Sequence, residues 1–342
     1  MEKKRDFSPL HYVRPNFSLF QKSPDFSLHY VVSFTSLNIY SSNILKETEY
    51  FSLTFYTNIL YTMSSSYSFK EYKYNDPIFR NIDATYIIHL EGNGRLASIK
   101  NQLFLYHPTS KVFIVFNKGF KNSKKEDYVN TPAKDLIDCF YYIFKDARSK
   151  GYQNILILED DFIFSTNIIE TKHSNEIDCF LENNMAANFV YYLGALCYLQ
   201  SGFGETHPRV ILSTGTHACI YSKKCIDYFL DNVDQKSLND WDVCLNFGSV
   251  PRYKYHLPLC YQTFPDTDNS RGWHRGSAIL FVIVWLQRGL LCKILGLDVA
   301  YEPGFSNMEL VSRVLFWIIL LGILYSIYKI IFKPLHISKI IT

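Results

Sequence analysis

Apolar and polar positions alternate in short blocks between residues 84 and 264. Runs rich in β-branched and aromatic residues, which are typical of buried strands, are separated by segments whose apolar residues recur at helical spacing. The predicted strands are residues 85–90, 111–117, 154–164, 188–194, 217–222 and 257–264, and the predicted helices are residues 96–106, 131–151 and 223–231. Strands that alternate with helices favour βαβ units, so we expect an α/β domain over residues 81–276, with a mostly parallel sheet flanked by helices.

The N-terminal part has a different texture. Residues 1–80 are rich in Ser, Phe, Tyr and Asn but follow neither the strand period nor the helix period, which predicts a poorly ordered segment. The charged opening, MEKKRD, is not followed by the apolar run of about 7–15 residues that a secretory signal peptide requires. We therefore expect the folded domain to lie in the cytosol.

The C-terminal part predicts a single-pass membrane anchor. Residues 314–328 contain no charged side chain, and with Lys329 reaching to the interface the apolar stretch attains the roughly 17–20 residues that span a bilayer. We expect a transmembrane helix over residues 311–332, preceded by an amphipathic helix and a connection over 277–310 and followed by a short tail over 333–342. A buried core helix is the alternative for the span, and the lysines around its end favour the opposite membrane orientation.

Composition and charge narrow the function classes. Hydrophobic residues make up 48% of the 342-residue chain and charged residues 20%, which is enough apolar material for a folded core. The formal net charge is +3 at pH 7, without a basic stripe, and this balance argues against a nucleic-acid partner. The 8 cysteines include no Cys-x-x-Cys pair, which favours reduced thiols over a zinc ribbon or a disulfide scaffold.

Three acids, Glu159, Asp160 and Asp161, directly follow the aliphatic run 155–158. The carboxyl ends of parallel strands are where open α/β sheets bind ligands. Adjacent carboxylates in an apolar setting repel one another unless a cation compensates them. Oxygen donors suit Mg²⁺ or Mn²⁺, which in turn bind the phosphates of a nucleotide. The alternative is a solvated acidic junction without a ligand.

The run ILILEDD resembles the strand and metal motif of GT-A glycosyltransferases. An ordered set of segments over about residues 84–275 is similar to glycosyltransferase family 25, which includes lipooligosaccharide and procollagen galactosyltransferases and relatives in large DNA viruses. The matching segments are Ile88-His89-Leu90 with Arg95, residues 215–224, Asp240-Trp241-Asp242 and residues 258–262. The chain departs from the family pattern at His89, where the family has Asn, and it lacks the Ser-His helix that usually precedes the acidic strand.

The resemblance implies a GT-A-like fold and a metal-dependent hexosyltransferase. Such an enzyme moves a sugar from a nucleotide sugar, here expected to be UDP-linked, to a hydroxyl group of a glycan or protein acceptor, with inversion at the sugar. Mn²⁺ or Mg²⁺ would be held by Asp161, with Glu159 and His274 as further ligands. The residues expected to contact the nucleotide sugar are Leu90, Arg95, Glu159, Asp160 and Arg271.

The acceptor side of the expected site needs a base for the attacking hydroxyl group. Asp242 and Asp240 both fit this role, although an acid at this position also serves as a helix N-cap. Trp241, His217 and Gln262 are expected to contact the substrate, Trp241 by stacking on a sugar. Two other functions stay open: a non-catalytic, membrane-tethered glycan-binding or scaffold protein with a degenerate GT-A fold, and a metal-dependent phosphohydrolase.

Overall fold

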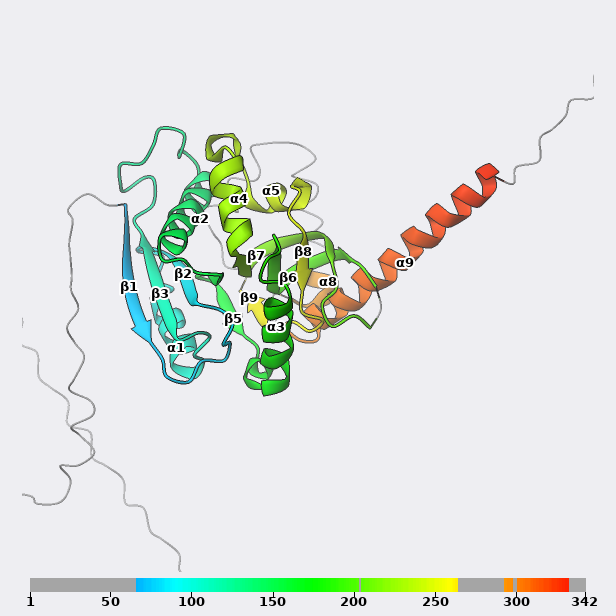
Figure 1. Ribbon diagram of the computed structural model, residues 1–342, viewed down its shortest axis with the longest axis horizontal. Helices are drawn as coiled ribbons and strands as arrows, with labels where there is room; N and C mark the ends of the chain where they lie inside the picture. Colours follow the sequence, from blue (N-terminus) through cyan, green and yellow to red (C-terminus); the bar gives the residue numbers. More distant parts are fainter. Residues whose placement is uncertain (1–65, 203, 264–291, 298–299, 332–342) are drawn as a thin grey trace, which may run out of the picture. The chain divides into compact units, whose positions relative to one another are not determined.

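The computed structural model describes residues 66–202, 204–263, 292–297 and 300–331. Their main feature is a seven-stranded sheet (Figure 1). In spatial order its strands are β1 (Tyr67–Lys73), β3 (Lys111–Asn117), β2 (Ala84–Leu90), β4 (Asn154–Glu159), β7 (Val210–Ser222), β6 (Val190–Gln200) and β8 (Arg252–Lys254). β1 and β7 run antiparallel to their neighbours, and the other five strands share one direction. The mixed α/β fold and the mostly parallel sheet expected from the sequence are confirmed.

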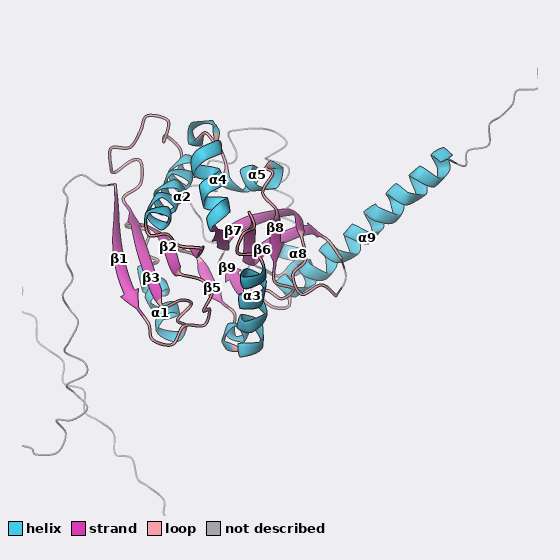
Figure 2. Cartoon of the chain, viewed as in Figure 1, coloured by secondary structure: helices cyan, strands magenta, loops and turns pink. Residues whose placement is uncertain are grey.

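Helices cover both faces of this sheet and enclose two apolar cores. Helices α2 (Pro132–Ser149), α4 (Lys223–Asn232) and α5 (Trp241–Phe247) cover one face, and α1 (Leu96–Leu105) and α3 (Thr171–Asn183) cover the other (Figure 2). Successive side chains of β4 divide between the cores, Ile155 and Ile157 in the first and Leu156 and Leu158 in the second. The aliphatic run of β4 is therefore buried on both sides.

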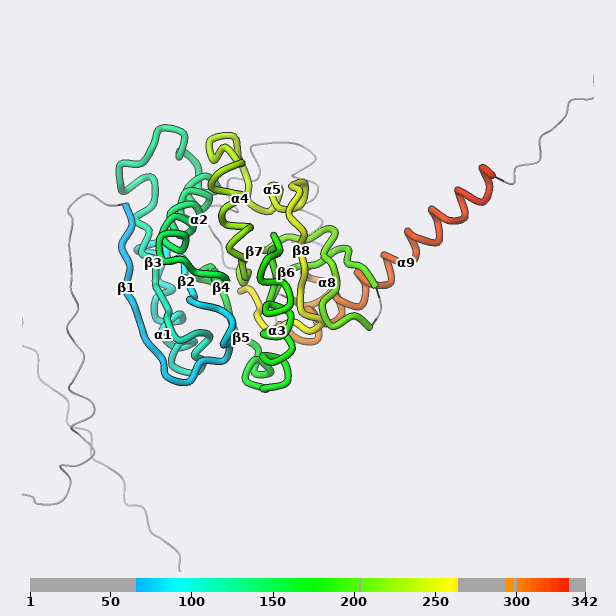
Figure 3. The backbone as a smooth tube through the Cα atoms, in the orientation of Figure 1, coloured from blue at the N-terminus to red at the C-terminus, as the bar shows by residue number. Residues whose placement is uncertain are grey.

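Strand β4 lies between β2 and β7, which are distant from it in sequence (Figure 3). The sequence predicts one strand over residues 154–164, but the structure divides it. β4 ends at Glu159, Asp160 and Asp161 form a turn, and β5 (Phe162–Phe164) pairs with β9 (Cys260–Gln262) in a separate two-stranded sheet. The acids thus occupy the junction between the two sheets.

The predicted boundary at residue 81 is wrong. β1 begins at Tyr67 and pairs with β3 along its whole length. Its sequence, YSFKEYK, alternates aromatic and polar residues and carries lysines, as edge strands of sheets do. Residues 1–65 lie outside the described part of the chain. So do residues 277–291 of the amphipathic helix and connection expected over 277–310, where α8 (Cys292–Leu295) is described.

Helix α9 (Gly304–Ile331) contains the expected span and starts earlier than the sequence predicted. By length and composition it can cross a membrane, and none of its most apolar window is buried in the protein. Its first turns are different, because Phe305 and Met308 pack with Leu196 and Tyr261 in an apolar cluster of the domain. One continuous helix therefore runs from the folded domain into the exposed apolar segment.

A buried ion pair joins α9 to the sheet. Lys254 of β8, which is 2% exposed, pairs with Glu309 of α9, which is 7% exposed. The Gln200 side chain at the end of β6 donates hydrogen bonds to a Glu309 carboxylate oxygen (2.8 Å) and to the Ser312 hydroxyl (2.6 Å). The Arg313 guanidinium donates to the His256 carbonyl (3.0 Å). These contacts fix the direction in which α9 leaves the domain.

Replacing Lys254 with methionine should destabilise the protein by about 3 kcal/mol or more, because the Glu309 carboxylate would stay buried without its partner. The matched control is Lys223→Met, which removes the partially exposed pair between Lys223 and Asp227 and should cost less than about 1 kcal/mol. Denaturant unfolding of the full chain in detergent measures both changes. Equal losses in the two variants would show that the buried pair does not stabilise the joint.

Candidate functional site

The acidic turn lies at the carboxyl end of β4 and is held from several sides. The Asp161 carbonyl accepts hydrogen bonds from the backbone N–H of Thr263 (2.9 Å) and from its hydroxyl (3.2 Å). Thr263 directly follows β9, so pairing of β9 with β5 fixes the turn. The three acids of this turn are adjacent in sequence, but each side chain contacts a different set of residues, as the next paragraphs describe.

Asp160 is satisfied by the segment that follows β2. Its carboxylate accepts from the Leu90 backbone N–H (3.2 Å) and the Asn93 side chain, and it forms an ion pair with Arg95. Burial raises the pKa of Asp160, but the His89 ring 3.5 Å away, the charge of Arg95 and the hydrogen bond from Asn93 outweigh burial and hold this pKa below its usual value. Asp160 and Arg95 therefore neutralise each other and fix the loop after β2.

Asp161 has an unsatisfied oxygen. The residue is 7% exposed, and its Oδ2 accepts from the Gln262 amide (3.1 Å). Its Oδ1 is buried and has no hydrogen-bond partner among the described residues. Burial and the nearby charge of Asp160 raise the pKa of Asp161 to about 6. In its ionised form this carboxylate lacks a compensating group on one side.

Glu159 adds a second carboxylate at the same place. It accepts a hydrogen bond from the Thr216 hydroxyl of β7 (2.8 Å). Burial, followed by the negative charge of Asp161, raises the pKa of Glu159 well above its usual value, and Asp242 contributes in the same direction. Glu159 therefore lies within electrostatic reach of both Asp161 and Asp242, and we call these three residues the carboxylate cluster.

Asp240 and Asp242, which the sequence leaves equivalent, have different surroundings. The Asp240 side chain caps α5 by accepting from the Val243 N–H (2.9 Å). Asp242 accepts from the Gly215 N–H of β7 (3.2 Å), one residue from Thr216. Burial and the charge of Asp240 raise the pKa of Asp242 to about 7. Asp242 is therefore the aspartate that belongs to the carboxylate cluster.

His217 and Gln262 lie beside the cluster but serve the protein itself. His217 is fully buried, its Nε2 lies 3.3 Å from the Cys260 carbonyl, and burial lowers its pKa to about 4. A side chain at Gly194 would come within 2.6 Å of this ring, so glycine is required there. Because Gln262 donates to Asp161, its amide positions that carboxylate. Both side chains thus contact groups of the protein next to the cluster, and their contact with a substrate stays a prediction.

The prediction that Trp241 stacks on a sugar is wrong. Trp241 is 3% exposed, its ring stacks on Phe140 at 4.7 Å, and its indole N–H donates to the Tyr221 hydroxyl (2.9 Å). It faces the core because α5 lies against the sheet, which leaves its first residue on the inner side. His274 and Arg271 lie outside the described residues.

The cluster fits a divalent cation in part. The described residues contain no group of three His, Cys, Asp or Glu side chains that could hold a metal ion. They do supply the Asp161 oxygen that is buried without a partner, next to the Glu159 carboxylate. Carboxylate oxygens are the donors that Mg²⁺ and Mn²⁺ prefer, so the residues present suit such an ion but form an incomplete set of ligands.

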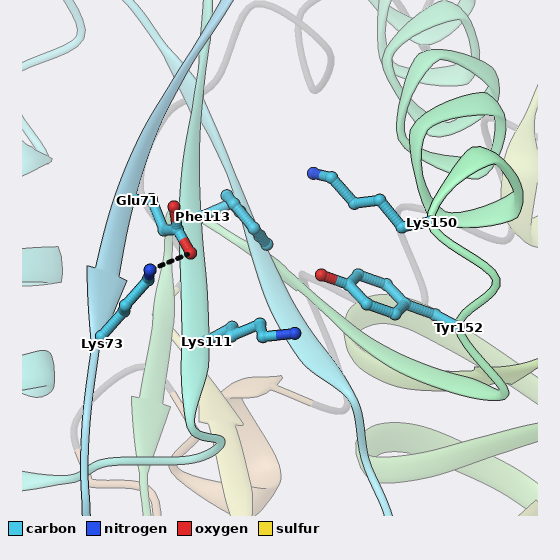
Figure 4. Close-up of a pocket in the computed structure, with 6 residues that line it drawn as sticks. All are labelled: Glu71, Lys73, Lys111, Phe113, Lys150 and Tyr152. Atoms are coloured by element: carbon cyan, nitrogen blue, oxygen red, sulfur yellow. Dashed lines mark ion pairs between the residues drawn. The ribbon is translucent and has the colours of Figure 1, made fainter. Parts of the chain in front are cut away.

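A separate open hollow of about 410 Å³ lies where β1 ends and β3 begins (Figure 4). It is lined by three lysines, Lys73, Lys111 and Lys150, and by Glu71, Phe113 and Tyr152. The Lys150 ammonium lies over the Phe113 ring (4.1 Å) and 2.7 Å from Asp146. This hollow is at the amino end of β3, whereas the carboxylate cluster is at the carboxyl end of β4.

The raised pKa of Asp161 predicts how stability depends on pH. The folded protein holds this proton more tightly than the unfolded chain, so the contribution of Asp161 is most favourable below about pH 4 and is lost as the pH rises through about 6. With divalent ions chelated, the free energy of unfolding of the wild type should fall by about 2 kcal/mol relative to Asp161→Asn between pH 4 and 7. Urea unfolding across this range measures the difference, and parallel pH profiles would contradict it.

The sequence matches no protein-family model and no curated protein. Among solved structures, A197 from STIV aligns with 55% of this chain and 87% of its own at 13% identity and a TM-score of 0.34. A glycosyltransferase involved in glycosylation of the major capsid of PBCV-1 aligns over 46% of this chain and 69% of its own, at 10% identity and a TM-score of 0.28. A Bacillus anthracis protein assigned as a glucose-1-phosphate thymidylyltransferase aligns over 65% of this chain and 79% of its own, at 12% identity and a TM-score of 0.28. At such scores these likenesses establish no activity for this chain.

Proposed function

We propose that this protein is a metal-dependent glycosyltransferase, anchored to a membrane by α9, that moves a sugar from a nucleotide sugar to a hydroxyl group. The observation that carries the proposal is the buried, unpartnered oxygen of Asp161 within a carboxylate cluster at the carboxyl end of β4. The ordered resemblance to family 25 supports it, because its separate segments supply Arg95, Thr216, Asp242 and Gln262 to one neighbourhood.

Each residue has a defined task in this proposal. Asp161 and Glu159 would hold a divalent cation, which neutralises the diphosphate leaving group as a Lewis acid. Asp242, whose pKa is raised to about 7, takes the proton of the acceptor hydroxyl. The hydroxyl oxygen bonds to the anomeric carbon while the bond from that carbon to the diphosphate breaks, and the nucleoside diphosphate leaves with the electron pair. The pair of Asp160 and Arg95 shapes the loop beside the donor.

The experiment is a screen of nucleotide sugars with the full chain in detergent. Each donor is incubated with Mn²⁺, Mg²⁺ or a chelator, and the products are resolved by chromatography. We expect a UDP-linked sugar to release UDP and free sugar only when a divalent cation is present. Release of nucleoside monophosphate and sugar phosphate would instead identify a phosphohydrolase. Absence of turnover together with absence of Mn²⁺ binding would favour the non-catalytic alternative.

A further inference from the structure

The level at which α9 leaves the domain is marked by the end of β6. Gln200, the last residue of β6, hydrogen bonds to Glu309 and Ser312. Two residues after Ser312, at Val314, the uncharged run of α9 begins, and its large apolar side chains are mostly exposed. A membrane crossed by α9 must therefore begin close to the level of Gln200.

Strand β7 carries exposed apolar side chains at that level. Leu212 pairs in register with Leu199, the neighbour of Gln200. Leu212 and Ile211 are each 42% exposed. Strand β6 pairs with β7 and also packs against α9, so these residues and α9 are neighbours of the same strand. As consecutive strand residues, Ile211 and Leu212 point to opposite faces of β7, so the strand is apolar and exposed on both faces at this level. Exposed apolar side chains next to the base of an apolar helix indicate an apolar environment there.

Helix α5 extends this apolar surface. Asn246 and Ser213 of β7 exchange two hydrogen bonds, of 2.7 and 3.1 Å, which fix α5 against the strand. Next to Asn246, Phe247 is 84% exposed, and one turn earlier Val243 is 42% exposed. We call the four residues Ile211, Leu212, Val243 and Phe247 the apolar rim.

The apolar rim is close to the carboxylate cluster. From Leu212, β7 continues to Gly215 and Thr216. The Gly215 N–H donates a hydrogen bond to Asp242, and the Thr216 hydroxyl donates one to Glu159. Four residues of strand span about 13 Å at most. The headgroup region of each leaflet is about 5–7 Å deep. A hydroxyl group carried above a lipid headgroup comes within reach of the cluster when the rim rests on the bilayer.

We propose that the apolar rim rests on the membrane that α9 enters and that the acceptor hydroxyl is carried by a membrane lipid, such as a glycolipid headgroup. The identity of the acceptor rests on the proposed function, whereas contact between rim and bilayer does not. The joint formed by Lys254, Glu309 and Gln200 keeps the domain in this orientation. Reaction with a dissolved acceptor does not require the carboxylate cluster to lie close to the bilayer surface.

Photolabelling tests the contact without any turnover. The full chain is reconstituted in phosphatidylcholine vesicles that contain a diazirine-bearing phosphatidylcholine, irradiated and mapped by mass spectrometry. We expect lipid adducts on peptides containing residues 211–212 and 243–247 as well as on α9, and loss of the α5 adducts in Phe247→Glu. Phe104 of α1, which is 81% exposed, is the matched control and should carry none. Adducts confined to α9 would overturn the contact.

Sugar transfer tests the acceptor class. Vesicles containing glucosylceramide and ceramide are compared with dissolved lactose and a hydroxylysine peptide, using the radiolabelled donor found in the screen. We expect at least about tenfold more label in the lipid extract than in the soluble acceptors, and about tenfold less lipid label for Phe247→Glu with unchanged donor hydrolysis. Label only in soluble acceptors refutes the lipid acceptor and leaves the glycosyltransferase intact. If no donor turns over, the function and the acceptor both fail, and the photolabelling alone decides the contact.

Discussion

Replacing Asp161 with asparagine should reduce cation-dependent turnover of the sugar donor by about 10²–10³-fold. The amide keeps the shape of the side chain and can still accept from Gln262, but it removes the charge next to the buried unpartnered oxygen. Turnover is measured with the full chain at saturating donor, and Mn²⁺ affinity is measured by calorimetry. Affinity should fall together with turnover, because the same oxygen serves both.

The matched control for Asp161→Asn is Asp231→Asn. Asp231 is an exposed carboxylate that pairs with Arg148 on the surface. This variant should keep both turnover and Mn²⁺ affinity. Asp161→Asn with wild-type turnover, or with lost turnover but unchanged Mn²⁺ affinity, would remove Asp161 from the cation site.

Replacing Asp242 with asparagine should reduce sugar transfer to the acceptor by about 10²–10⁴-fold, the usual contribution of a general base. In the wild type, transfer should rise with pH through about 7, since only the deprotonated carboxylate accepts the proton. This rise should be absent in Asp242→Asn. Initial rates of transfer between pH 5 and 9 measure both effects.

Asp240→Asn separates the two aspartates that the sequence leaves equivalent. Asparagine caps a helix about as well as aspartate, so α5 should remain intact. Removing the charge of Asp240 lowers the pKa of Asp242, so the pH profile should shift toward lower pH while the maximal rate persists. A loss of rate in Asp240→Asn that matches the loss in Asp242→Asn would contradict the assignment of the base.

Strand β4 and the place of the acids at its end were predictable because local sequence determines them, whereas the break between β4 and β5 and the edge strand β1 were not. An aliphatic run such as ILIL fits only a buried strand in this context, and the acids after it must lie at its carboxyl end. The helix predicted over 131–151 is confirmed as α2, which the Thr131 side chain caps by accepting from the Lys134 N–H. These features depend on neighbours within a few residues.

The partners of the acids were not predictable, because they come from distant segments. Thr216 meets Glu159 only because β7 lies antiparallel beside β4, a register that no local pattern specifies. Trp241 turns into the core because of how α5 packs on the sheet, which the tripeptide containing it does not reveal. Its place between Asp240 and Asp242 led to the prediction that it stacks on a sugar.

The joint between α9 and the sheet has a practical consequence for making a soluble form of the protein. A chain ending before residue 304 would uncover Leu196 and Tyr261 and leave Lys254 buried without Glu309. A chain ending at residue 310 would still lose two hydrogen bonds: the one from Gln200 to the Ser312 hydroxyl and the one from Arg313 to the His256 carbonyl. The shortest version that retains every one of these contacts ends just after Arg313, where the uncharged run begins.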